Sequence, residues 1–139
     1  MKKLLVAILF LASASCCTRY ASAQAIIVNP SVKASEASKA ELREIFSGAA
    51  SSLKDGSHVT PVLQKGGAAH EAFLSSIVGK ADAAFRVSWR SLVFSGQGVM
   101  PKNLDNDAAV VEYVAHTPGA IGYVAKDSGH DGVKVLAVH

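Results

Sequence analysis

A glycine turn between two apolar segments is the part of the sequence best suited to binding chemistry. The segment LQKGGAAHEAF, residues 63–73, joins a strand-like run to a helix-like run through Gly66 and Gly67. A helix N-terminus presents free backbone N–H groups and the positive end of the helix dipole, so such a turn can hold an anion. Lys65 adds a cation, and His70 falls in the first helical turn, where a neutral imidazole that donates a hydrogen bond is favoured.

The same turn also has a purely structural interpretation. It carries no Ser or Thr hydroxyl where a phosphate site usually has one, and it lacks the GxxxxGK[ST] spacing of a P-loop. From the residues alone, the segment either binds an oxyanion or only turns the chain.

Other catalytic and metal-binding patterns are absent from the sequence. The histidines show no metal-ligand spacing, and there is no GxSxG elbow, HExxH motif or paired-carboxylate motif. A second glycine segment, SGQG at residues 95–98, precedes a proline rather than a helix and is interpreted as a connection. We therefore expect no enzyme, no metal site and no cofactor.

Residues 1–23 are predicted to be a secretory signal peptide, which leaves residues 24–139 as one domain. A basic MKK start, an apolar run of about a dozen residues and the small residues ASA before Gln24 form this pattern. Cleavage after Ala25 fits as well, whereas a lipoprotein modification at Cys16 fits less well because Ser13 stands where a leucine is expected. The apolar run is shorter than the roughly 20 residues of a membrane span. The expected location is periplasmic or secreted.

Removal of this segment changes the charge and the cysteine content. The full sequence has 14 Lys+Arg and 11 Asp+Glu, and Lys2, Lys3 and Arg19 lie in the signal, so the mature chain would carry 11 of each. This balance does not predict a strongly basic protein surface that would bind nucleic acid or a membrane. Both cysteines would also leave, so stability must come from one apolar core without disulfides.

The remaining sequence alternates between strand and helix patterns. Strands are expected at residues 25–29, 58–63, 120–125 and 133–138, and helices at residues 38–48, 68–79, 82–96 and 105–119. The order β-α-β-α-α-α-β-β predicts a single α/β domain. The first two strands, separated by one helix, are expected to form a parallel pair, with Pro61 at an edge or a bulge.

Local signals locate the helices. Ser38 and Glu41 form a capping-box pattern, and Gly48 can end that helix in a left-handed conformation. In the third helix, Arg86 and Arg90 fall away from the apolar face and are expected to be solvated.

Taken in order, the segments resemble the phosphate-binding, periplasmic substrate-binding proteins of ABC transporters. IIVNPS followed by SKAELREIFSG is similar to a strand, turn and helix of that family, and HVTPVLQKGGAAHEAF stands where the family has a strand and a Gly-Ser-Gly-Thr anion loop. FRVSWRSLVFSGQGVMPKNL and EYVAHTPGAIGYVA match a later helix and strand entry. The most specific piece is TPGAIGYV, residues 117–124, and the match covers nearly all of residues 25–139.

The resemblance implies a fold, a site and partners. The fold is a single lobe of the type II periplasmic-binding-protein-like fold, with a mixed sheet flanked by helices. The partners would be phosphate or a similar oxyanion, together with an ABC transporter permease or a second protein lobe. The implied oxyanion site consists of Lys65, Gly66, Gly67, Ala68, Ala69 and His70.

The sequence departs from the family at this site. The family's Ser and Thr hydroxyls fall near Gly67 and Ala69, and the arginine that usually precedes the loop has no clear equivalent. One lobe would leave a bound anion in contact with water, where charge contacts are weak. Two functions are therefore considered: weak phosphate or oxyanion binding in transport, and a non-catalytic protein-interaction or structural module that kept the fold and lost ligand binding.

Overall fold

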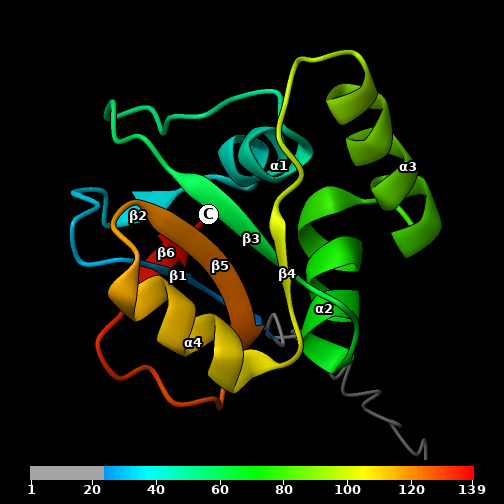
Figure 1. The fold of residues 1–139 in the computed structure, drawn as a ribbon. Helices are drawn as coiled ribbons and strands as arrows, with labels where there is room; N and C mark the ends of the chain where they lie inside the picture. Colours follow the sequence, from blue (N-terminus) through cyan, green and yellow to red (C-terminus); the bar gives the residue numbers. More distant parts are fainter. Residues whose placement is uncertain (1–23) are drawn as a thin grey trace, which may run out of the picture.

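One six-stranded sheet organises the part of the chain that the computed structural model describes, residues 24–139 (Figure 1). The predicted signal peptide lies outside the described residues. The strands are β1 (Gln24–Val28), β2 (Glu36–Ala37), β3 (Thr60–Gln64), β4 (Lys102–Leu104), β5 (Ala120–Ala125) and β6 (Lys134–Val138). The helices are α1 (Lys39–Ser47), α2 (Ala68–Phe73), the π-helix η1 (Leu74–Val78), α3 (Asp82–Phe94) and α4 (Asp107–His116).

The sheet is mixed, as the family resemblance implied, and its order is β2-β6-β1-β5-β3-β4. The central strand β5 runs antiparallel to β1 and parallel to β3. The predicted parallel pair of the strands at residues 25–29 and 58–63 is therefore wrong, because β5 lies between β1 and β3 and the two run in opposite directions. The physical reason is burial: residues 120–124 of β5 are all buried, and such a strand belongs in the middle of a sheet.

Pro61 lies in an internal strand rather than at an edge. It pairs with Ile121 of β5, whereas the ladder between β3 and β4 starts one residue later, at Val62. The missing proline N–H therefore costs no hydrogen bond to β4. The strand β4 was not among the strands expected from the sequence, because KNL has no apolar alternation that would indicate a strand.

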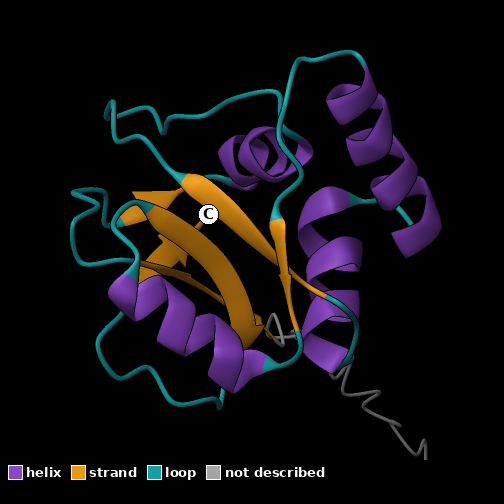
Figure 2. Ribbon diagram, viewed as in Figure 1, coloured by secondary structure: helices purple, strands orange, loops and turns teal. Residues whose placement is uncertain are grey.

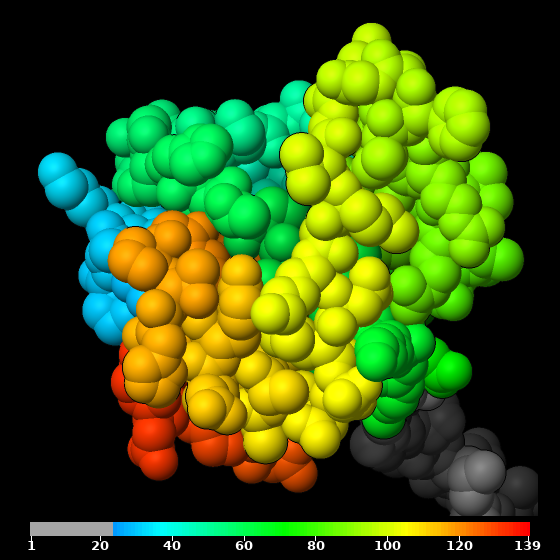
Figure 3. Space-filling model, viewed as in Figure 1, coloured from blue at the N-terminus to red at the C-terminus, as the bar shows by residue number. Residues whose placement is uncertain are grey.

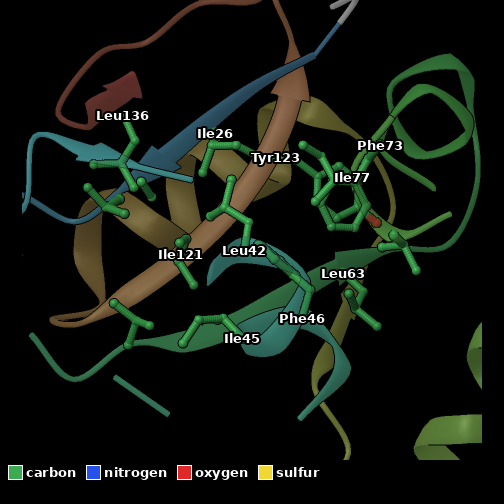
Figure 4. Packing of buried hydrophobic residues seen from close by; sticks show 14 of the residues in the cluster. Ile26, Leu42, Ile45, Phe46, Leu63, Phe73, Ile77, Ile121, Tyr123 and Leu136 are labelled. Carbon is green, nitrogen blue, oxygen red and sulfur yellow. The ribbon is translucent and has the colours of Figure 1, made fainter. Parts of the chain in front are cut away.

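Helices cover both faces of the sheet (Figure 2). The larger core cluster contains buried residues of α1, α2, η1 and α3, and the smaller cluster contains buried residues of α4 on the opposite face. In the larger cluster, the rings of Phe73 and Tyr123 stack with their centroids 3.9 Å apart, and Phe46 meets Phe73 edge-on at 4.7 Å (Figure 4).

The predicted capping signals of α1 are confirmed. The Ser38 hydroxyl accepts the Glu41 N–H at 3.1 Å, and the Glu41 carboxylate accepts the Ser38 N–H at 2.8 Å. Gly48 ends the helix with φ 82°. These hydrogen bonds satisfy donors at the helix start, and they keep the pKa of Glu41 below its usual range.

Two helices differ from their predicted form. The helix expected at residues 68–79 changes from α to π geometry at Leu74, and the Arg43 side chain donates to the carbonyl of Ile77 in the π segment at 3.0 Å. α3 buries Phe85 and Trp89 as expected, but Val93 is exposed because the helix extends past the core.

Within residues 24–139, no helix is long and apolar enough to span a membrane.

Candidate oxyanion turn at the start of α2

The predicted glycine turn connects the end of β3 to the start of α2. Gly67 is the N-cap and has φ 101° and ψ 174°, a backbone conformation that residues other than glycine rarely adopt. The first helical hydrogen bond runs from the Glu71 N–H to the Gly67 carbonyl at 3.0 Å. In the described chain, the backbone N–H groups of residues 66–70 donate to no carbonyl or side chain. These five groups are the donors that an oxyanion could use.

Lys65 lies beside the turn and is paired with a carboxylate. Its Nζ is 2.7 Å from Oδ1 of Asp105, and both side chains are exposed. The Lys65 N–H donates to the carbonyl of Leu104 on β4 at 3.0 Å. Because an exposed ion pair is worth only about 0.2–1 kcal/mol, Lys65 can exchange Asp105 for an anionic ligand at small cost.

The imidazole of His70 points inward and is only 2% exposed. Its Nε2 is 2.7 Å from Oδ1 of Asp82, and its Nδ1 is 2.5 Å from the Tyr123 hydroxyl. That hydroxyl also accepts the Gln64 N–H at 2.9 Å. Both ring nitrogens of His70 are therefore engaged by Tyr123 and Asp82 and not by a ligand. Only the backbone N–H of His70 belongs to the free donors.

Arg86 clamps the carbonyl side of the turn. Its Nη2 donates to the carbonyls of Gln64 at 3.2 Å and Lys65 at 3.1 Å, and its Nη1 donates to the Asn103 amide oxygen at 3.0 Å. Its Nε lies 3.0 Å and 3.1 Å from the two oxygens of Asp82. The expectation that Arg86 is solvated is wrong, because the guanidinium reaches back from α3 to β3 and β4.

Asp82 links the imidazole and the guanidinium. The hydrogen bond from His70, followed by that from Arg86, keeps the pKa of the Asp82 carboxyl below its usual range. On the other side of His70, burial raises the pKa of Tyr123, so its hydroxyl stays protonated and acts as a hydrogen-bonding group. Neither Asp82 nor Tyr123 was predicted from the sequence as part of the site; for Asp82, the i,i+4 spacing with Arg86 was the available signal.

Gln64 fixes the turn to the other face of the sheet. Its buried amide Nε2 donates to Asp107 Oδ1 at 2.7 Å and to the Tyr123 carbonyl at 2.8 Å. The second Asp107 oxygen accepts the Ala125 N–H at 3.2 Å. Side chains from α3, α4 and β5 thus hold Gln64 and Lys65, the two residues that lead into the glycines.

The side-chain charges around the turn are net negative. The cations are Lys65 and Arg86, and the carboxylates are Asp82, Asp105, Asp107 and, in the first turn of α2, Glu71. An anion would therefore be held mainly by the backbone donors and little by net charge. Over residues 24–139, no group of three or more His, Cys, Asp or Glu side chains is placed to hold a metal ion.

No protein-family model matches the chain, and no curated protein matches it either.

Comparison with solved structures identifies the fold. A protein assigned as a phosphate ABC transporter substrate-binding protein of Clostridium perfringens, solved with bound phosphate, matches with TM-score 0.64 and 18% identity over 84% of this chain and 44% of that chain. PstS from Borrelia burgdorferi matches with TM-score 0.61 and 16% identity over 84% of this chain and 47% of its own. A phosphate transport receptor from Vibrio cholerae matches with TM-score 0.54 and 15% identity over 84% and 46%. The chain shares the fold of these phosphate substrate-binding proteins and spans less than half of their length.

Proposed function

We propose that this chain is an exported solute-binding-protein-like domain that binds phosphate or a similar oxyanion weakly at residues 65–70. The observation that carries the proposal is the set of backbone N–H groups of residues 66–70 without a partner in the described chain, which follow two residues, Gln64 and Lys65, held by side chains from three other elements. The shared fold with phosphate substrate-binding proteins supports the ligand class. An ABC transporter permease would be the partner in transport, and the chain would act in the periplasm or outside the cell.

The proposed affinity is low for two physical reasons. The turn supplies no hydroxyl group, because glycine and alanine occupy positions 67 and 69, and the ammonium of Lys65 already pairs with Asp105. The residues of this turn form one wall, so water reaches the bound anion from the other side and weakens each contact. A dissociation constant on the order of 1 mM corresponds to about −4 kcal/mol, which a few solvated hydrogen bonds can supply.

Titration of isotope-labelled residues 24–139 with phosphate tests the proposal. The amide resonances of residues 66–70 should shift and saturate in the millimolar range, and sulfate should act similarly because it offers the same oxygen geometry. Chloride at matched ionic strength is the control. Unchanged amide shifts in this segment at tens of millimolar phosphate would reject the ligand.

A protein-interaction module is the second candidate function. It is favoured by the composition of the turn, which has no hydroxyl at positions 67 and 69 and whose Lys65 is already paired with Asp105. Size-exclusion chromatography with light scattering separates the candidates. A dimer that forms only with phosphate indicates capture of the ligand between two copies, whereas a monomer indifferent to phosphate favours the interaction module.

A further inference from the structure

Apolar side chains gather at the C-terminal end of α3 and in the loop that follows. Phe94 is 96% exposed and Val99 is 87% exposed, and Val93 and Met100 beside them are also exposed. We call these four residues the apolar tip. In the ribbon view, the end of α3 and the loop after it stand away from the sheet, and the space-filling view shows the same segment rising above the rest of the molecule (Figures 1 and 3). Val87 extends the tip along α3, because it lies two helical turns before Phe94 on the same side.

Folding does not account for the apolar tip. α3 is anchored through Phe85 and Trp89, and the Trp89 indole N–H donates to the Phe46 carbonyl at 2.9 Å. Leu92 packs at the edge of the same cluster. The helix continues beyond these contacts and carries Phe94 into solvent, where a large apolar side chain contributes nothing to the core.

The segment that carries the apolar tip contains only cationic charges. Residues 85–104 contain Arg86, Arg90 and Lys102 and no Asp or Glu, although the domain as a whole is balanced. Arg86 is engaged with the glycine turn, and Lys102 lies 4.8 Å from the centre of the Tyr113 ring. Arg90 is exposed, one helical turn before Phe94, and it makes no ion pair within residues 24–139. Asp82 neutralises Arg86, so the exposed cation beside the apolar tip that has no ion-pair partner among the described residues is Arg90.

We infer that the apolar tip docks on the surface of an anionic lipid bilayer. Phe94 and Val99 enter the boundary between headgroups and acyl chains, and Arg90 lies at the level of the lipid phosphates. The contact is interfacial, in agreement with the absence of a spanning helix in the described chain. A second copy is a poor occupant, because two such tips facing each other would bring Arg90 against Arg90. A projecting tip also offers no groove to a partner's helix. The inference is independent of oxyanion binding.

Vesicle flotation tests the inference. The experiment uses residues 24–139, the chain expected after removal of the signal peptide, so the apolar N-terminal run cannot contribute to binding. Vesicles of phosphatidylcholine with phosphatidylglycerol should bind the protein, and vesicles of phosphatidylcholine alone should bind several-fold less. Phe94→Ser should lower partitioning about tenfold or more, which is the scale for burying one aromatic side chain. Arg90→Glu should lower it several-fold, and added salt should remove that difference.

Matched variants at other exposed positions serve as controls. Val135→Ser on β6 removes another exposed valine, and Lys126→Glu reverses another exposed cation, on the loop after β5. Both should bind vesicles as the wild type does, with unchanged circular dichroism in all variants. The inference is overturned if the wild type floats with neither kind of vesicle, or if Phe94→Ser binds as well as Val135→Ser. It is also overturned if light scattering shows a Phe94-dependent dimer and no vesicle binding, since the tip would then serve self-association.

Discussion

The hydroxyl of Tyr123 joins the glycine turn to His70. It accepts the N–H of Gln64 at 2.9 Å and meets the imidazole of His70, and both neighbours are buried. Tyr123→Phe would leave a buried N–H and a buried ring nitrogen without partners, and such groups cost about 1–3 kcal/mol. We expect urea denaturation to show a loss of that size in the free energy of unfolding. Tyr113→Phe is the matched control, because the hydroxyl of this half-buried tyrosine makes no hydrogen bond within residues 24–139. It should change the free energy of unfolding by less than about 0.5 kcal/mol. Equal losses in the two variants would contradict the role of the hydroxyl.

Asp82 makes part of the stability depend on pH. Hydrogen bonds from His70 and then Arg86 hold the pKa of the Asp82 carboxyl below its usual range. The ionised carboxylate therefore adds to the free energy of unfolding above the unfolded pKa of about 4, and this stabilisation is lost as pH falls through the folded pKa. Because the side chain is 48% exposed, water screens the contact and the effect should be about 0.5 kcal/mol. Asp82→Asn should therefore lose this part of the acid dependence when unfolding is measured between pH 2.5 and 6. Asp127→Asn, at an exposed loop position, should keep the wild-type slope.

The location of the turn could be predicted from the sequence, but its supporting side chains could not. The glycines and the change from strand to helix pattern are local signals, and they locate residues 65–70 correctly at the start of α2. The clamp by Arg86 depends on how α3 folds back over β3 and β4, and that proximity has no local signature. For the same reason, the burial of the His70 ring between Tyr123 and Asp82 was not foreseen.

At the scale of elements, the predictions that hold rest on short-range spacing. The capping box and the left-handed glycine of α1 are each determined by contacts within one or two turns of the helix. The order of the strands is determined by competition for burial across the sheet. β5 occupies the centre because both of its faces are apolar, and no spacing within residues 25–63 reveals that. The hydrogen bond from Arg43 of α1 to Ile77 of η1 is likewise a contact between helices that has no local sequence signal.

The contact between α4 and the sheet depends on the absence of a side chain at Gly122. A Cβ built there would lie 2.8 Å from Val110 Cγ1 and 3.0 Å from Val62 Cγ2, closer than packed carbon atoms allow. Gly122→Ala would push α4 away from β5 and should cost about 1–3 kcal/mol, which denaturant unfolding would detect. Gly129→Ala places its methyl group in open space and should be nearly neutral. If both variants unfold at the same urea concentration, the packing of α4 is more tolerant than this geometry indicates.

At the scale of the whole molecule, binding at the turn and folding stability are linked. A ligand that binds only the folded state stabilises the domain by mass action. With a dissociation constant of about 1 mM, phosphate at about 10 mM should add about 1.4 kcal/mol to the free energy of unfolding. For a domain of this size, that corresponds to a rise of about 5 °C in Tm, measured against chloride at equal ionic strength.

A proline at position 68 separates specific binding from general salt effects. Ala68 is the first residue of α2, where the N–H has no helical partner and proline is tolerated, so Ala68→Pro removes one ligand donor and keeps the helix. Phosphate is also excluded from protein surfaces, and this stabilises folded proteins without any site. We expect Ala68→Pro to lose most of the phosphate-dependent rise in Tm while its own Tm in chloride stays near the wild-type value. An equal rise in both proteins would mean that phosphate acts through exclusion and that the turn only reverses the chain.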